Sequence, residues 1–122
     1  MGMQVIEGAG RYTPAAGEPT HWAEHLASAD LSVGTYSIPA GGLDDQEPHR
    51  EDEIYVVQAG AATLVTDSGA AQVQAGSVIF VPAGEGHRFT DVREDLALLV
   101  IFAPPYGSRS DVESAAAATS SS

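Results

Sequence analysis

Short apolar segments recur along the chain, and each alternates apolar and small or polar residues in the manner of a β-strand. Because successive side chains of a strand point to opposite faces, such segments predict strands that are buried on one side. Residues that favour turns separate them at intervals of about 8 to 12 residues, which is typical of an all-β sandwich or barrel. The expected strands cover residues 31–38, 53–58, 62–66, 71–75, 77–81, 87–92 and 95–103.

The two ends of the chain lack this alternation. Residues 1–20 are rich in Gly, Pro, Ala and Thr, and residues 1–30 are expected to form an N-terminal arm, with one short edge strand as an option. Within it, residues 20–30 predict either a helical turn capped by Thr20 or an extended piece anchored by Trp22 and Leu26. Residues 108–122 have low complexity and predict a disordered or loosely helical tail. A single β-barrel domain with flexible termini is therefore expected over residues 31–107.

Two segments determine how the strands are expected to pair. An Ala-Gly turn at residues 59–60 is expected to fold residues 53–58 against residues 62–66 as a hairpin. Residues 95–103, DLALLVIFA, are apolar on both faces, which a small barrel cannot bury by itself. The sequence therefore predicts a homodimer, and the N-terminal arm is a candidate for crossing to the partner.

Composition narrows the classes of partner. The chain has 122 residues with a net charge of -12, and its 5 basic residues are all arginine. Such a surface repels nucleic acid and anionic membranes, so neither is expected as a partner. No run of about 18 apolar residues predicts a membrane span, and the N-terminus lacks the features of a secretory signal. Without cysteine, disulfides and thiolate catalysis are excluded, and a cytoplasmic location is expected.

One stretch carries unusual chemistry. Residues 47–53, EPHREDE, crowd acidic side chains around a histidine at the start of an apolar strand. Acids this close repel one another, so they form either a solvated edge or the surroundings of a cation. In an extended segment Glu47, His49 and Glu53 share a face, and His87 opens a later strand. Two imidazoles with one or two carboxylates are a suitable ligand set for a divalent metal.

These positions resemble the two sequence motifs of the cupin family. The first motif is G-x5-H-x-H-x3,4-E-x6-G, and its spacing is matched by Gly41, Glu47, His49, Glu53 and Gly60. The second is G-x5-P-x-G-x2-H-x3-N, and its spacing is matched by Gly76, Pro82, Gly84, His87 and Asp91. The resemblance implies a small single-domain cupin of the microbial type, whose β-barrel is also called a double-stranded β-helix or jelly roll.

The resemblance also implies a metal site, with two departures from the family pattern. His49, Glu53 and His87 are the expected ligands, and Fe(II) is favoured over Mn, Ni or Zn. Glu47 replaces the first histidine of the family, so it is either a fourth ligand or the general base of the reaction. Gln46 can replace it as a ligand if the backbone bulges there. Asp91 replaces an asparagine and is expected to be structural, with its side chain on the face of His87.

The activity implied by the resemblance is that of a metal-dependent enzyme acting on a small organic substrate, with a dioxygenase as the favoured form. A non-oxidative lyase, isomerase or decarboxylase is an alternative, and so is a non-catalytic module that binds a small ligand or a metal. Three residues are the first candidates for walls of a substrate pocket: Tyr36, Tyr55 and Phe89. Other aromatic residues are expected in the core: Trp22, Phe80 and Phe102. A solvated rim is expected from Asp44, Asp45, Glu51 and Asp52.

Overall fold

The fold was analysed in a computed structural model, which describes residues 2–14, 17–44 and 48–108. Gln46, Glu47 and the predicted tail from residue 109 onward lie outside the described residues. Six strands occur in the described part of the chain: β1 (His21–Ala27), β2 (Ser32–Ile38), β3 (Asp52–Thr66), β4 (Gly69–Gln74), β5 (Val78–Val81) and β6 (His87–Ala103). No helix in the same residues is long and apolar enough to cross a lipid bilayer.

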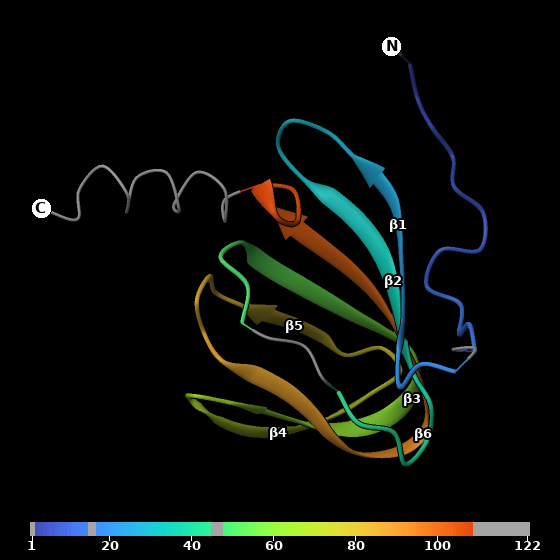
Figure 1. Cartoon of the computed structure of the whole chain (residues 1–122), viewed down its shortest axis with the longest axis vertical. Helices are drawn as coiled ribbons and strands as arrows, with labels where there is room; N and C mark the ends of the chain where they lie inside the picture. Colours follow the sequence, from blue (N-terminus) through green and yellow to red (C-terminus); the bar gives the residue numbers. More distant parts are fainter. Residues whose placement is uncertain (1, 15–16, 45–47, 109–122) are drawn as a thin grey trace, which may run out of the picture.

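All strand pairings are antiparallel, and they form one sheet in the order β1-β2-β6-β3-β4, with β5 paired to β3. The long strands β3 and β6 lie at its centre, and the sheet curls around them (Figure 1). The predicted all-β fold is confirmed. It follows from the two-residue alternation of the chain, which gives each strand one apolar face to bury.

The expected hairpin at residues 59–60 is wrong, because β3 continues without a turn from residue 52 to residue 66. The register between β3 and β6 shifts on both sides of Ala59, so the strands bulge and bend there. Gly60 has a φ of 93°, and a Cβ atom on it would lie 2.4 Å from the carbonyl oxygen of Asp95. Glycine therefore permits a sharp bend within the strand, where the sequence had suggested its end.

This bend folds the sheet upon itself. The expected strands 87–92 and 95–103 are likewise one strand, β6, which bends together with β3. The first half of β6 pairs with the second half of β3, in the lower part of Figure 1, and its second half pairs with β2 and with the first half of β3, in the upper part. The apolar core lies within the fold and includes Ile38, Tyr55, Leu96, Leu98 and Val100.

The N-terminal arm contributes to the sheet. Residues 21–27 form strand β1, which pairs with β2 and sets Trp22 opposite Tyr36. The extended alternative for residues 20–30 is therefore correct and the helical turn is wrong, so the sheet begins before residue 31. Further upstream, the amide of Gly10 donates to Oγ1 of Thr35 at 2.7 Å. This part of the arm thus packs on the sheet of its own chain.

A row of apolar side chains lies on the outer face of the sheet. The register places Phe80, Ile54, Ile101 and Val33 side by side across β5, β3, β6 and β2. Phe80, expected in the core, is 61% exposed, because the inward positions of β5 are Ile79 and Val81. The outer faces of residues 95–103 are partly covered by their neighbours. The uncovered apolar surface is therefore centred on β5.

The homodimer stays a prediction, and this row is its expected contact. Two chains of charge -12 repel each other, so they are expected to meet where charged side chains are missing. Phe80→Glu should then convert a dimer into a monomer in sedimentation velocity at micromolar concentration. Val65→Glu, an exposed valine outside the row, should remain dimeric. A monomeric wild type would contradict the dimer, and a dimer insensitive to Phe80→Glu would contradict its location.

Candidate metal centre

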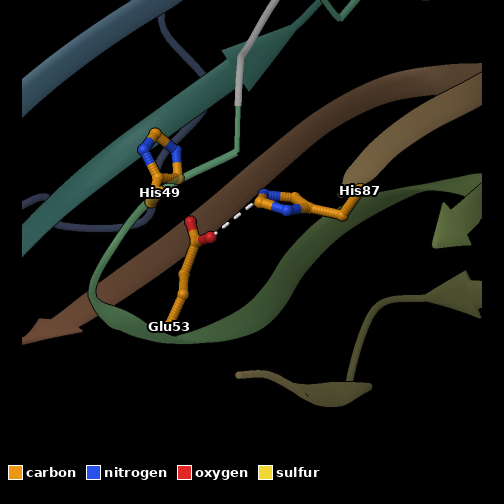
Figure 2. A group of neighbouring side chains, drawn as sticks. All are labelled: His49, Glu53 and His87. Atoms are coloured by element: carbon orange, nitrogen blue, oxygen red, sulfur yellow. Dashed lines mark ion pairs between the residues drawn. The ribbon is translucent and has the colours of Figure 1, made fainter. Parts of the chain in front are cut away.

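The three expected metal ligands come together at one end of the fold. His49 lies in the loop before β3, Glu53 is near the start of β3, and His87 is the first residue of β6. One ligand atom from each lies within 4.8 Å of the other two. Figure 2 shows the three side chains converging, with Nε2 of His87 3.1 Å from Oε1 of Glu53.

The bend at Gly60 makes this convergence possible. Along the paired strands, Glu53 lies opposite Phe102 near one end, whereas His87 lies opposite Thr66 at the other end. Glu53 and Thr66 are 13 residues apart along β3. In a flat sheet the two ends would therefore be separated by roughly 40 Å, at about 3.3 Å per residue. Because β3 and β6 fold over together, the two ends of the same pair of strands meet. The metal site therefore depends on the bend as much as on the ligands.

The two loops that carry the histidines are joined by backbone hydrogen bonds. The amide of Gly84 donates to the carbonyl oxygen of His49 at 2.7 Å. The amide of the preceding residue, Ala83, also donates across the two segments, to the side-chain oxygen Oδ1 of Asp52 at 3.0 Å. The segment that precedes His87 thus fixes the segment that carries His49. Such support holds ligands in place before a metal binds.

The orientation of the His87 ring leaves one nitrogen available as a ligand. Its Nδ1 atom lies 3.0 Å from the carbonyl oxygen of Glu85, which can only accept a hydrogen bond. Nδ1 therefore carries the proton of the neutral ring, and Nε2 presents a lone pair toward Glu53. The hydroxyl of Tyr55 lies 3.0 Å from the same Nε2 and donates to it when no metal is bound.

Glu53 gives a direct test of whether the residues suit a metal ion. Its side chain is 1% exposed, and while His87 is neutral both carboxylate oxygens are buried without a hydrogen bond among the described residues. Protonated His87 can donate to Oε1 from Nε2, at 3.1 Å. Burying an anion without donors is costly, whereas a bound cation would satisfy both oxygens. Two imidazoles and one carboxylate form a ligand set that leaves coordination positions open for a substrate. The residues present fit a divalent metal.

The pKa values of the two histidines move in opposite directions. Burial lowers the pKa of His49, and the nearby carboxylate of Glu53 only partly opposes it. Burial also acts to lower the pKa of His87, but its bonds to Glu53 and to the Glu85 carbonyl outweigh this effect and raise it. Burial, followed by the charge of Glu53, raises the pKa of the Tyr55 hydroxyl well above its usual value, so that it stays protonated.

These shifts predict the pH behaviour of the metal-free protein. The charged form of His87 is stabilised by the fold, so this contribution is full below the unfolded pKa of about 6.5. It is lost as the pH rises through the raised folded pKa. His49 behaves oppositely and destabilises the fold as the pH falls below about 6.5. In an NMR titration of the imidazole rings, His87 should titrate above His49. The reverse order would contradict the described geometry.

A cavity of about 160 Å³ lies beside the candidate ligands. The residues that line it are Thr20, Trp22, Tyr36, His49, Glu53, Phe102 and Tyr106. Of the three expected pocket walls, Tyr36 lines this cavity. Tyr55 and Phe89 lie in the core behind the ligands and contact each other edge to face, with ring centroids 4.9 Å apart.

Several functional residues were missed by the sequence analysis. Trp22 and Phe102 were expected in the core, Thr20 was considered only as a helix cap, and Tyr106 was given no role, yet all four line the cavity. Pairing of an extended segment of residues 20–30 with the strand that contains Tyr36 would have placed Trp22 near the cavity. The same residues also allowed a helical turn, so the sequence did not determine that pairing. Tyr106 follows the last strand, where no periodicity indicates which way a side chain points.

Two acidic residues expected on the solvated rim are buried. Asp44 is 4% exposed and Glu51 is 2% exposed. Asp44 accepts hydrogen bonds from the hydroxyl of Tyr36 at 2.8 Å and from the amide of Phe89 at 2.9 Å. The loop before β3 is therefore held against β2 and β6, and buried acids surround the candidate centre. Asp52, by contrast, is exposed as expected.

Asp91 does not share the face of His87. Its φ is 49°, in the left-handed region, and its side chain is 66% exposed. The carboxylate instead pairs with Arg93 at 2.6 Å. Asparagine and aspartate adopt this backbone conformation more readily than most residues, which accounts for aspartate at this motif position. A structural role for Asp91 agrees with this geometry.

Comparison with known proteins identifies the fold family. The family model described as the cupin domain matches residues 34–102. An uncharacterized protein of Streptomyces coelicolor is 44% identical over 82 residues, which cover 67% of this chain and 78% of that protein. Among solved structures, an uncharacterized protein of Klebsiella pneumoniae with a double-stranded β-helix domain has a TM-score of 0.72 at 16% identity, covering 84% of this chain and 91% of the other.

A solved enzyme has a similar fold. DMSP lyase DddQ from Ruegeria pomeroyi gives a TM-score of 0.66 at 20% identity, covering 83% of this chain and 54% of the lyase. The chain thus spans about half the length of that enzyme, and at this identity the likeness shows the fold alone. Because the family model covers more than half of the sequence and the structures agree with it, the chain belongs to the cupin family.

Proposed function

We propose that this cupin is a metal-dependent enzyme acting on a small organic substrate, and specifically a dioxygenase that uses Fe(II). The observation that carries the proposal is the buried carboxylate of Glu53, which lies beside two imidazoles and lacks hydrogen-bond donors while His87 is neutral. His49, Glu53 and His87 would hold the ion, a ligand set typical of non-haem iron. When bound, Fe(II) supplies a Lewis acid that can also exchange electrons with oxygen.

The walls of the cavity support the oxidative form. Apart from the two candidate ligands His49 and Glu53, the described residues of its lining offer hydroxyl groups but no other carboxylate or imidazole. A dioxygenase places both atoms of O₂ in the product, with the substrate supplying the electrons, so neither an external reductant nor a strong protein base is needed. Glu47 stays a proposed general base or ligand, because it lies outside the described residues. The proposed setting is a reducing cytoplasm, where Fe(II) persists.

A non-oxidative lyase is the second candidate, and one contact favours it. The hydroxyl of Tyr36 lines the cavity and donates to the buried carboxylate of Asp44 at 2.8 Å. Such a pair can pass a proton between a substrate and the protein. Tyr36→Phe should therefore reduce a lyase reaction by about 100-fold or more, whereas a dioxygenase should retain most of its activity.

Metal analysis and oxygen uptake test the proposal together. Protein purified without chelator should contain one transition metal ion per chain, and the Fe(II) form should consume oxygen with its substrate. His87→Ala should lose the metal, whereas His21→Ala, a histidine outside the cluster, should keep it. Metal-dependent turnover without oxygen consumption would reject the dioxygenase activity and support the lyase activity. A chain that binds no metal after reconstitution would overturn both and leave a non-catalytic binding module.

A further inference from the structure

The walls of the cavity are almost entirely aromatic. Phe102 and Tyr106 lie with their ring centroids 4.9 Å apart, and Trp22 approaches both at about 6 Å. The His49 ring meets the same two rings edge to face, at 5.0 and 5.2 Å. A metal held by His49 would thus lie beside a set of ring faces and edges. Such surroundings favour a flat, unsaturated ligand, which can pack against them in stacked or edge-on geometry.

The charges around the cavity limit the charge of the ligand. No arginine lines the cavity in the part of the chain that the structure describes, and the sequence contains no lysine. With Glu53 as its only charged ligand, a divalent ion keeps one net positive charge, which a singly charged anion would neutralise. Asp44 and Glu51 are buried nearby and disfavour additional negative charge. Phosphorylated compounds and polycarboxylates are therefore poor candidates, and a neutral or monoanionic ligand is favoured.

The volume limits the size of the ligand. An apolar cavity of about 150 Å³ holds a benzene molecule, and the cavity here measures about 160 Å³. It therefore has room for one six-membered ring with small substituents. The open coordination positions beside two imidazoles and a carboxylate suit a chelating pair of oxygen atoms.

Trp22 is held in the cavity by the residue beneath it. A Cβ atom on Gly34 would lie 2.2 Å from Cη2 and 2.6 Å from Cζ2 of Trp22, so the indole lies directly over the glycine. Gly34 is in β2 and Trp22 is in β1, and neither is a candidate metal ligand. The indole therefore determines the width of the cavity independently of the metal centre.

From these observations, and building on the proposed metal site, we propose that the ligand is a single flat ring with two adjacent oxygen donors, of the size and charge of catechol. We further propose that Trp22 is the residue that determines the upper limit of ligand size. Its indole forms the wall that a larger substituent would meet, whereas the metal contributes affinity for the two oxygens.

Ligand binding to the Zn(II)-loaded full chain tests this proposal, since Zn(II) does not oxidise catechols. Catechol should bind in calorimetry and change the fluorescence of Trp22, the only tryptophan in the chain. Resorcinol, with non-adjacent oxygens, and citrate, with its higher charge, should bind at least about tenfold more weakly. The larger 4-tert-butylcatechol should also bind at least about tenfold more weakly to the wild type.

Variants separate the wall from the metal. Trp22→Ala should still bind Zn(II) but should no longer discriminate against 4-tert-butylcatechol. If the alanine variant unfolds, Trp22→Phe replaces it: this variant keeps an aromatic wall and should discriminate less than the wild type. His87→Ala should bind neither Zn(II) nor catechol. A wild type that binds Zn(II) but not catechol, or that prefers citrate, would overturn the ligand class and leave the metal centre intact. Unchanged discrimination in both Trp22 variants would overturn the role of Trp22, and failure to bind Zn(II) would instead reject the proposed function.

Discussion

Gly60→Ala is expected to lower the free energy of unfolding by at least about 3 kcal/mol and to abolish tight metal binding. Two costs combine at this position. A residue with a Cβ atom is strained at a φ of 93°, and that atom would overlap the carbonyl oxygen of Asp95 at 2.4 Å. The overlap involves backbone on both sides, so no side-chain rotation can relieve it. Relief requires β3 and β6 to straighten, which would separate Glu53 from His87.

Gly76→Ala is the matched control for this experiment. Gly76 has a φ of 96°, nearly the same as Gly60, but a Cβ atom there would meet nothing within 4 Å. The free energy of unfolding of Gly76→Ala should therefore fall only by the backbone strain, about 1 to 2 kcal/mol, and the variant should bind metal normally. Urea unfolding and metal titration of the two variants measure the difference. Equal losses in both would show that the bend at Gly60 is not required for the site.

Glu53→Gln is expected to weaken metal binding by at least about 100-fold without destabilising the metal-free protein. The carboxylate is the charged ligand, so the amide removes most of the attraction for the cation. In the metal-free protein, however, the same carboxylate is buried without hydrogen-bond donors once His87 is neutral. An uncharged side chain of equal size should then be tolerated or even stabilising at a pH above the pKa of His87.

A loss of metal affinity without a loss of stability in the metal-free protein distinguishes a metal ligand from a structural residue. Metal affinity is measured by competition with a chelator, and stability is measured by urea unfolding in the presence of excess chelator. Asp52→Asn removes the charge of the neighbouring exposed carboxylate but keeps the oxygen that accepts from the amide of Ala83, so it should leave metal binding close to that of the wild type. A Glu53→Gln protein that binds metal normally, or that loses stability only in the absence of metal, would contradict the assigned role.

The sequence predicted the strands and the candidate ligands because both signals are local. Alternation with a period of two residues identifies a strand wherever it lies in the fold. The spacing from His49 to Glu53, together with the second motif around His87, identifies the imidazoles and the carboxylate through their resemblance to the cupin motifs. Neither signal requires knowledge of the remaining chain.

The errors concern features that depend on tertiary contacts. Gly60 was interpreted as a turn, because a glycine that ends a strand and one that bends it look the same in the sequence. The burial of Asp44 depends on the hydroxyl of Tyr36 and the amide of Phe89, which come from two different strands. The position of Trp22 depends on the missing side chain of Gly34 in the next strand. Pairwise contacts of this kind have no periodic signature.

The central claim is that one divalent ion binds between His49, Glu53 and His87. Crystals of the protein loaded with Fe(II) or Zn(II), measured at the absorption edge of the metal, locate that ion directly. The account predicts one anomalous peak per chain, at about 2.0 to 2.2 Å from an imidazole nitrogen of each histidine and from a carboxylate oxygen of Glu53. A peak bound by other residues, or no peak at saturating metal, would contradict it.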